Sequence, residues 1–244
     1  MRRPSRSVRL FITGTDTGVG KTHVTCLIAR QLIARGIRVA AYKPVCSGVL
    51  PASPMMSANV PGSLPQWDDI ERIKSAIGGD WPDEVICPQR FLASLAPPVA
   101  ARLEGRTVEF ELLVDGVDAF RDVEMLLVEG AGGWLSPLTD TRSVADLAAQ
   151  FGDPVLIVAR TGLGTINQTL LTIESIRARG LTVAGIILND TVALDADASI
   201  HTNADEIEAR SGAPVFGTVS YGSSSELHRN GKPVTINWRQ LASL

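Results

Sequence analysis

A short segment near the N-terminus combines glycines, a lysine and a threonine in an order that can bind phosphate. Residues 14–22 read Gly-Thr-Asp-Thr-Gly-Val-Gly-Lys-Thr and lie between a predicted strand at 8–13 and a predicted helix at 21–34. Glycines let backbone N–H groups turn toward an anion, and the start of the helix adds its positive end. Lys21 can reach the outer phosphates of a nucleotide, and the Thr22 hydroxyl can ligate Mg²⁺. The segment is therefore interpreted as a nucleotide phosphate loop.

The spacing of this loop differs by one residue from the pattern G-x-x-x-x-G-K-[ST]. Thr15 occupies the position of the first glycine, and Gly14 lies one residue earlier. A plain glycine turn with an exposed lysine is the alternative interpretation. The guanine-reading segment N-K-x-D is absent from the sequence, and the nearest candidate, Asn189-Asp190, lacks the lysine. The sequence therefore favours ATP over GTP.

Acidic residues follow the phosphate loop at places where a metal ligand is expected. Glu129 comes directly after an apolar strand at 125–128 and precedes the Gly-Ala-Gly-Gly run at 130–133. An acid at the carboxyl end of a strand beside a phosphate loop suits a Mg²⁺ ligand, and a surface acid that caps a loop is the alternative. Asp69 opens a predicted helix as a further ligand or as a first-turn acid that complements the helix dipole. Asp68 competes with it for either role.

Three more polar positions follow predicted strands. Lys43 comes after a strand at 37–42, where its ammonium can neutralise an anionic substrate or can simply be solvated. The run Gly-Leu-Gly-Thr-Ile-Asn at 162–167 joins a strand to a helix and forms either a second anion site or a tight turn. Asn189 ends a strand, where its amide can read a base edge or form a turn.

The elements that must position these residues alternate along the chain. Fully apolar strands separated by helices predict one α/β domain over 8–244, with a parallel sheet flanked by helices on both faces, as in P-loop NTPases. A flexible basic leader is expected at 1–7, and a loop rich in Pro, Ser and Met at 49–66. The expected strands are 8–13, 37–42, 85–91, 125–128, 154–159, 183–188 and 214–219. The expected helices are 21–34, 69–77, 97–103, 109–120, 144–150, 166–179 and 198–210.

Composition narrows the class of partner. The 244 residues carry 23 Lys and Arg against 26 Asp and Glu, and this net charge of −3 argues against nucleic-acid binding through a basic surface. Three cysteines without a C-x-x-C pair argue against a disulfide framework or a zinc site and favour reduced thiols in a cytoplasm. No stretch approaches the ~20 apolar residues that span a bilayer, so no membrane partner is expected.

Five segments together resemble the dethiobiotin synthetase family. They are Thr13–Thr22 (TGTDTGVGKT), Tyr42–Gly48 (YKPVCSG), Val128–Leu138 (VEGAGGWLSPL), Leu163–Asn167 (LGTIN) and Leu188–Asp190 (LND). The resemblance implies ATP- and Mg²⁺-dependent ring closure of 7,8-diaminopelargonate with CO₂ to dethiobiotin, ADP and phosphate. The implied route passes through a carbamate and a carbamic-phosphoric mixed anhydride. The resemblance also implies a cytoplasmic homodimer with its substrate site near the subunit interface.

The same resemblance implies roles for individual residues. Lys21, Lys43 and Thr17 are the expected catalytic residues, and Thr22, Asp69 and Glu129 are the expected Mg²⁺ ligands. The substrate is expected to contact Lys43, Ser47, Gly132, Gly164 and Asn167, with the loop through Asn167 taking the carboxylate tail from the partner chain. The nucleotide is expected to contact Gly18, Val19, Gly20, Lys21, Thr22, His23, Glu129, Gly130, Ala131, Gly132, Asn189, Asp190 and Ser220.

The chain departs from the family pattern at two positions. Gly18 stands where several members have Glu, and Ser220 replaces a proline of the adenine loop. A regulatory ATPase of the partitioning or septum-site type is the alternative function. That class resembles K-G-G-x-G-K-T, and residues 15–18 contain no such lysine. An amidotransferase of the cobyrinate type needs an appended glutaminase domain, for which this chain has no room.

Overall fold

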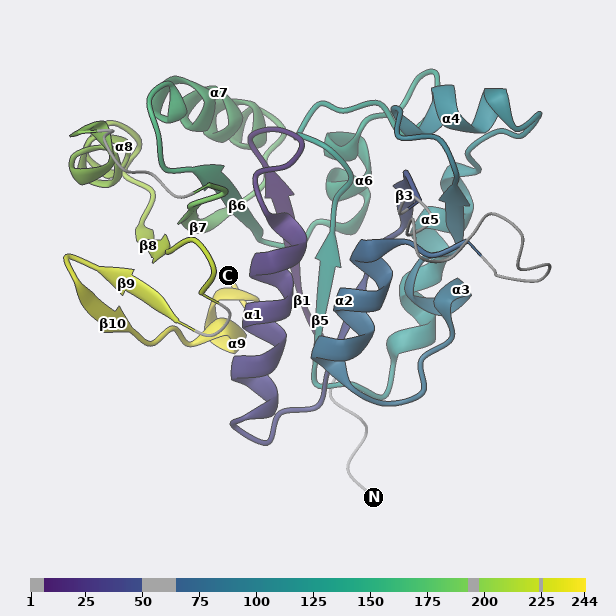
Figure 1. Cartoon of the computed structure of the whole chain (residues 1–244), viewed down its shortest axis with the longest axis horizontal. Coiled ribbons are helices and arrows are strands. Elements are labelled where there is room, and N and C mark those ends of the chain that lie inside the picture. Colours follow the sequence, from purple (N-terminus) through teal and green to yellow (C-terminus); the bar gives the residue numbers. More distant parts are fainter. Residues whose placement is uncertain (1–6, 50–64, 193–197, 224–225) are drawn as a thin grey trace, which may run out of the picture.

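The structure is a computed structural model that describes residues 7–49, 65–192, 198–223 and 226–244. Figure 1 shows one sheet running through the molecule, with helices in front of it and behind it. Most of the expected loop at 49–66 and all but the last residue of the basic leader lie outside the described residues. The division into leader and domain therefore stays a prediction.

The central sheet has eight strands in the order β10-β9-β8-β7-β6-β1-β5-β2. Its parallel strands are β1 (Val8–Gly14), β2 (Val39–Tyr42), β5 (Met125–Glu129), β6 (Val155–Arg160), β7 (Val183–Asn189) and β8 (Val215–Val219). Strands β9 (Leu227–Arg229) and β10 (Lys232–Val234) pair antiparallel at one edge. The expected parallel sheet is confirmed, and the antiparallel edge is an addition to it.

Helices cover both faces because the strands are apolar on both sides. On one face, α1 (Lys21–Ile33), α2 (Asp68–Ile77) and α9 (Trp238–Leu241) pack against side chains such as Leu10 of β1. On the other face, Phe11 of β1 joins a second apolar cluster. The helices of that second face are α4 (Pro97–Leu103), α5 (Phe110–Asp115), α6 (Val144–Phe151), α7 (Thr165–Ala178) and α8 (Asn203–Ser211). Successive residues of a strand point to opposite faces, so each strand contributes to both clusters.

Four expectations about elements are wrong in detail. The strand expected at 85–91 is a short helix, α3 (Asp83–Ile86), followed by β4 (Gln89–Phe91). Proline at position 88 ends the helix, because the residue before a proline prefers the extended conformation that Cys87 adopts at φ −141°. β4 pairs in parallel with β3 (Val45–Ser47) in a separate two-stranded sheet that the sequence did not predict.

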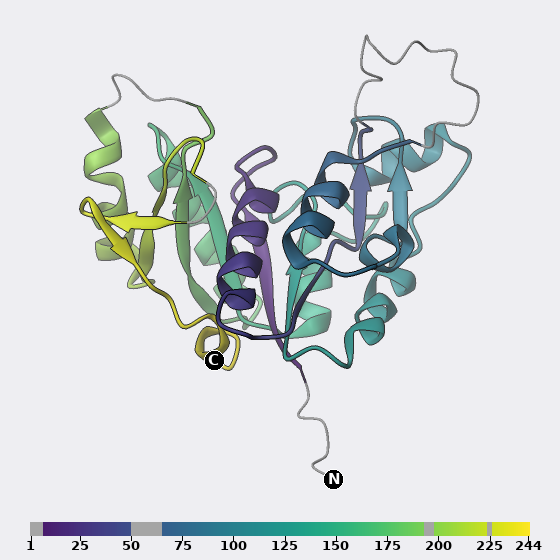
Figure 2. The same cartoon turned by 60° about the horizontal axis from the view of Figure 1, so that its bottom comes forward.

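The other three differences lie in the helices expected at 109–120 and 198–210 and at the C-terminus. The helix expected at 109–120 divides into α5 and the 3₁₀ turn η1 (Gly116–Phe120). The short turn η2 (Ala198–His201) likewise precedes α8. The strand β8 is not the last element, because the β9–β10 hairpin and α9 follow it. Figure 2 shows this C-terminal segment running back beneath the sheet beside α1.

The order of the central strands sets up a site at their carboxyl ends. Strand β5 lies between β1 and β2, with Glu129 in register with Ile12 and Tyr42 in register with Val128. The phosphate loop, Lys43 and Glu129 therefore emerge at the same edge of the sheet. Among the described residues, no helix has the length and apolar character needed to cross a membrane.

Candidate active site

The loop between β1 and α1 has a fixed shape that leaves room for an anion. Gly20 caps α1 with φ 91°, a left-handed conformation that favours glycine. A Cβ atom at Gly14 would lie 2.8 Å from the carbonyl oxygen of Asp16, so the loop folds back closely on itself. Asn189 on β7 donates an Nδ2 hydrogen bond to the carbonyl of Val19, at 3.0 Å. A strand two places away from β1 in the sheet thus holds the loop.

Lys21 lies inside this loop and is almost completely buried. Its Nζ donates to the carbonyl oxygen of Asp16 at 3.3 Å. Burial, and then the positive charge of Lys43, lowers the pKa of Lys21 to about 8. A phosphate would supply the negative charge that favours the protonated ammonium, so the geometry and the electrostatics both suit an anionic ligand.

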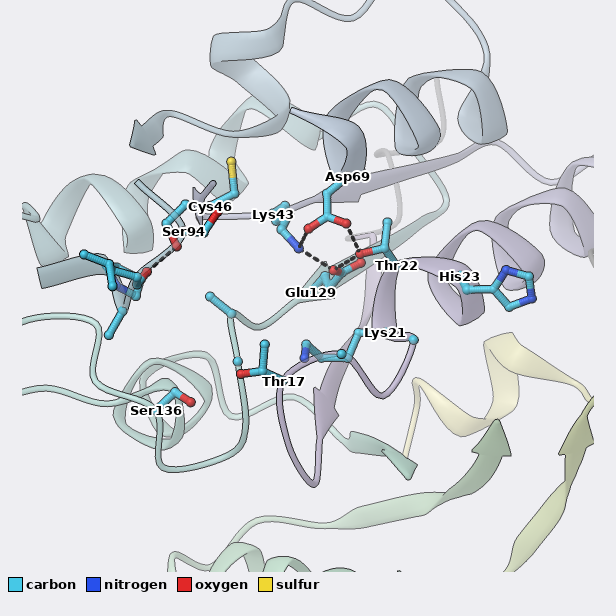
Figure 3. Close-up of a pocket in the computed structure, with 18 of the residues that line it drawn as sticks. Thr17, Lys21, Thr22, His23, Lys43, Cys46, Asp69, Ser94, Glu129 and Ser136 are labelled. Atoms are coloured by element: carbon cyan, nitrogen blue, oxygen red, sulfur yellow. Dashed lines mark hydrogen bonds and ion pairs between the residues drawn. The ribbon is translucent and has the colours of Figure 1, made fainter. Parts of the chain in front are cut away.

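A compact charge cluster lies beside the loop, as Figure 3 shows. Lys43 Nζ is 2.6 Å from Glu129 Oε1 and 2.7 Å from Asp69 Oδ2. The Thr22 hydroxyl oxygen lies 2.6 Å from Glu129 Oε1 and 2.8 Å from Asp69 Oδ1. A hydroxyl has one proton, so Thr22 donates to one carboxylate at a time. Four side chains from α1, α2, β5 and the end of β2 therefore converge within hydrogen-bond distance.

The charges in this cluster stabilise one another. Burial alone would lower the pKa of Lys43, but the charges of Glu129 and Asp69 outweigh burial and hold that pKa above its usual value. Burial alone would raise the pKa of Asp69, but the ammonium of Lys43 holds it below its usual value. The cluster therefore contains a charged, buried lysine and a charged Asp69 carboxylate that is partly exposed.

The donor set of the cluster fits Mg²⁺. The buried Oε2 atom of Glu129 has no hydrogen-bond partner, and the Thr22 hydroxyl and the Asp69 carboxylate add further hard oxygen donors. The described residues contain no group of three or more His, Cys, Asp and Glu side chains that could hold a metal alone. Mg²⁺ in nucleotide enzymes is bound by one or two carboxylates together with phosphates, which matches this set. Asp68 instead pairs with Arg72 at 3.5 Å, so Asp69 is the carboxylate that faces the cluster.

A pocket of about 760 Å³ opens in front of the loop and the cluster. It brings together most of the residues that the sequence singled out as a site. Those residues are Thr17, Gly18, Gly20, Lys21, Thr22, His23, Lys43, Ser47, Asp69, Glu129, Ala131 and Gly132. Sequence reasoning missed further lining residues, namely Cys46, Arg72, Ser94, Leu95, Ala96, Pro97 and Ser136.

Comparisons with known proteins agree with what the geometry of the site indicates. The AAA domain family matches residues 8–228. The ATP-dependent dethiobiotin synthetase BioD of Anaeromyxobacter sp. (strain Fw109-5) is 50% identical over 199 residues, which cover 81% of this chain and 83% of that protein. The protein of the same name from Caulobacter vibrioides (strain NA1000 / CB15N) is 40% identical over 188 residues, which cover 75% and 80% of the two chains. The chain belongs to the dethiobiotin synthetase family.

Membership of the dethiobiotin synthetase family agrees with the resemblance carried by the five sequence segments. A solved structure of chloroplast FtsY from Physcomitrella patens aligns with a TM-score of 0.50 at 13% identity, covering all of this chain and 66% of that one. At that identity the likeness shows a shared fold alone. The relatives are named as synthetases, which favours the family over the alternative of a regulatory ATPase.

Several residues that the family resemblance singled out lie outside the pocket. Val19 is buried within the phosphate loop, and Asn189 is buried against it. Gly130 donates its N–H to the carbonyl of Ile12 at 2.9 Å. Asp190 accepts a hydrogen bond from Thr161. Three expected contacts are exposed away from the pocket, and they are Gly164, Asn167 and Ser220.

The missed lining residues carry weak sequence signals. Ser94 to Pro97 form an apolar loop with no spacing that suggests chemistry. Ser47 Oγ donates to the carbonyl of Leu95 at 2.5 Å, which brings this loop to the pocket wall beside Ser47. Arg72 follows Asp69 by one helical turn, a spacing that places both residues on one face of α2. This spacing is the sequence signal from which Arg72 could have been predicted as a lining residue.

Proposed function

We infer that this protein is an ATP-dependent dethiobiotin synthetase. It joins CO₂ to 7,8-diaminopelargonate and closes the ureido ring of dethiobiotin, and it converts ATP to ADP and phosphate. The observation that carries the inference is 50% identity over 81% of the chain to a protein of that name. The pocket supports it, because a phosphate loop, two lysines and two carboxylates meet at the carboxyl ends of neighbouring strands.

The reaction requires three steps in which atoms balance. One substrate amine attacks CO₂ and loses a proton, which gives a carbamate. A carbamate oxygen then attacks the γ-phosphorus of ATP, and ADP leaves. The second amine attacks the carbonyl carbon of the mixed anhydride, phosphate leaves, and the cyclic urea forms.

Positioning and charge neutralisation are what this chemistry needs from the protein. Glycines 18 and 20, together with the start of α1, place backbone N–H groups against the phosphates, and Lys21 carries its ammonium to the outer ones. Lys43 lies on the pocket wall at the end of β2, where it is placed to neutralise the carbamate and the transferred phosphoryl group. Thr17 lines the same pocket on the loop side and serves as a further contact to the phosphoryl group.

Thr22, Asp69 and Glu129 are the residues that would hold Mg²⁺. When bound, this ion supplies charge neutralisation for the phosphates of the nucleotide. The ammonium of Lys43 contacts both carboxylates, so Lys43 also balances the negative charge of this part of the site. The nucleotide contacts expected at Asn189, Asp190 and Ser220 stay predictions.

The diamine is placed in the half of the pocket that the β4–α4 loop lines. Leu95, Ala96 and Pro97 present apolar surface there for an aliphatic chain, and Ser47 lies beside them. Gly132 also lines the pocket and lies beside the phosphate loop, because a Cβ atom there would lie 3.5 Å from the hydroxyl of Thr17.

We also place the enzyme in the cytoplasm as a homodimer. Leu135 is 60% exposed and Leu171 of α7 is 58% exposed. The Trp134 Nε1–Ser175 Oγ hydrogen bond of 3.1 Å brings their two segments together. Exposed apolar surface of this kind suits a protein partner. Gly164 and Asn167, exposed at the start of the same helix, would then receive the carboxylate tail of the substrate from the partner chain.

The test is product formation from labelled bicarbonate. The purified protein is incubated with ATP, Mg²⁺, 7,8-diaminopelargonate and ¹³C-bicarbonate, and products are read by mass spectrometry. We expect dethiobiotin with a single labelled carbon, and no product from the Lys21→Ala variant. A wild-type protein that folds, binds ATP and yields no labelled dethiobiotin would contradict the proposed function.

A further inference from the structure

Arg72 is a cation on the pocket wall to which neither the family resemblance nor the reaction gives a role. It lies on α2, one turn after Asp69, and its side chain is 43% exposed. Residues three apart on a helix share a face, so the carboxylate at 69 and the guanidinium at 72 both border the pocket. The metal-ligand candidate and Arg72 are therefore delivered by the same rigid element.

The charges of the pocket leave Arg72 available for an anion. Among the described residues that line the pocket, the lysine and arginine side chains are Lys21, Lys43 and Arg72. Lys43 is held between two carboxylates. Arg72 has only the Asp68 carboxylate as an acidic partner among the described residues, at 3.5 Å, and that side chain is 53% exposed. Exposed ion pairs of this type contribute little free energy, so the guanidinium can exchange Asp68 for a phosphate at a small cost in free energy.

His23 fixes where the guanidinium lies. An Arg72 Nη2 donates to His23 Nδ1 at 3.3 Å, and the other ring nitrogen, Nε2, lies 2.6 Å from the carbonyl oxygen of Ser223. A carbonyl oxygen can only accept, so Nε2 carries the proton and Nδ1 offers its lone pair to Arg72. Both contacts are satisfied together by the neutral ring. His23 therefore acts as a positioning residue for Arg72.

The place of this pair relative to the nucleotide follows from the phosphate loop. Figure 3 shows His23 on the opposite side of Thr22 from Cys46 and Ser94, which line the half assigned to the diamine. Lysine at position 21 reaches the β- and γ-phosphates in such a loop, and the backbone cradles the α- and β-phosphates. The end of the nucleotide that lies away from the substrate is the end that carries the α-phosphate and the ribose. Arg72 borders the pocket at that end.

We propose that Arg72 is a nucleotide-binding residue whose guanidinium, held by His23, contacts the nucleoside phosphate nearest the ribose. Guanidinium groups match phosphate oxygens in a two-pronged geometry that lysine cannot reproduce. The ligand class is a nucleoside di- or triphosphate. This proposal rests on the synthetase function inferred above, and it adds a third cation to the two lysines of that mechanism.

Direct binding of ADP separates this proposal from the activity. We compare wild type, Arg72→Met, Arg72→Lys and Arg121→Met by isothermal titration calorimetry. Arg121 pairs with Asp118 on the surface and is 75% exposed, so its variant matches the charge change away from the pocket. Arg72→Met should weaken ADP by about 10- to 100-fold, the loss expected for a hydrogen bond between charged groups. Arg72→Lys should recover part of that loss, and Arg121→Met should match wild type.

Steady-state kinetics and a double-mutant cycle complete the test. Arg72→Met should raise KM for ATP and leave KM for 7,8-diaminopelargonate unchanged. His23→Ala should weaken ADP less than Arg72→Met, and the double variant should show less than the product of the two losses, because both act through one contact. An ADP Kd within about twofold of wild type in Arg72→Met, or an equal loss in Arg121→Met, would overturn the proposal. A rise in KM for the diamine alone would also overturn the proposal, because it would indicate that Arg72 contacts the diamine and not the nucleotide. Failure of the synthetase function would show instead as intact ADP binding without dethiobiotin.

Discussion

Replacing Lys43 by methionine removes the ammonium from a site where two carboxylates depend on it. Lys43 is 4% exposed and Glu129 is fully buried, and the ammonium lies within 2.7 Å of both carboxylates. Breaking a buried pair by removing one partner costs about 3–5 kcal/mol, because an uncompensated charge remains. At about 2–4 °C per kcal/mol for a chain of this size, the midpoint of thermal unfolding, Tm, should fall by about 6–20 °C.

The second part of this prediction concerns the effect of Mg²⁺ on the stability of the Lys43→Met variant. If Thr22, Asp69 and Glu129 form the metal site, the ion can replace the missing positive charge in the Lys43→Met variant. Mg²⁺ should therefore raise Tm more in the variant than in wild type, where Lys43 competes for the same oxygens. A ligand at about 100 times its Kd adds about 2.7 kcal/mol, which sets the scale of the recovery.

The assay is thermal unfolding followed by circular dichroism, with and without Mg²⁺. Lys74→Met is the matched control, because Lys74 also contacts an aspartate at 2.6 Å but its side chain is 33% exposed. That surface pair should cost about 1 kcal/mol or less. The double variant Lys43→Met/Glu129→Gln should be more stable than Lys43→Met alone, since it leaves one charge fewer unpaired. A loss in Lys43→Met no larger than in the control, or equal Mg²⁺ responses in variant and wild type, would refute the reasoning.

Three further outcomes follow from the structure. Burial lowers the pKa of Lys21 to about 8, so ATP binding at about pH 8.5–9 should take up close to one proton and should weaken as pH rises. Calorimetry in buffers of different ionisation enthalpy measures the proton uptake, and the same uptake in Lys21→Met would contradict this assignment. Asn167→Ala should raise KM for 7,8-diaminopelargonate and not for ATP, and the reverse pattern would reject its role at the substrate tail. Ser143→Ala removes the capping box of α6 and should cost about 1 kcal/mol of stability, read as a Tm about 2–4 °C lower; an unchanged Tm would show that the cap contributes nothing.

The central sheet and the phosphate loop could be predicted because their signals are local. A buried parallel strand reads as a continuous apolar run, and the glycine, lysine and threonine of the loop are adjacent in sequence. Asp69 was singled out from its place at the start of a helix, but Asp68 could not be separated from it. Consecutive residues of a helix point in different directions, so only one of the two carboxylates can face the pocket. The tertiary contact with Thr22 shows that it is Asp69.

The rest of the site depends on contacts that no short pattern encodes. Strands β3, β9 and β10 are three residues long, too short for a period of two to be visible. The β4–α4 loop reaches the pocket only because β4 pairs with β3. Cys46 and Cys87 are 41 residues apart in sequence, but their sulfur atoms lie 3.5 Å apart, and nothing in either segment indicates that neighbour.

Phosphate release coupled to the diamine tests the central claim most directly. Wild-type protein is given ATP, Mg²⁺ and bicarbonate, and inorganic phosphate is followed with and without 7,8-diaminopelargonate. The account predicts phosphate release only when the diamine is present, with one dethiobiotin formed for each phosphate. Phosphate release at the same rate without the diamine would instead indicate an ATPase and would contradict the account.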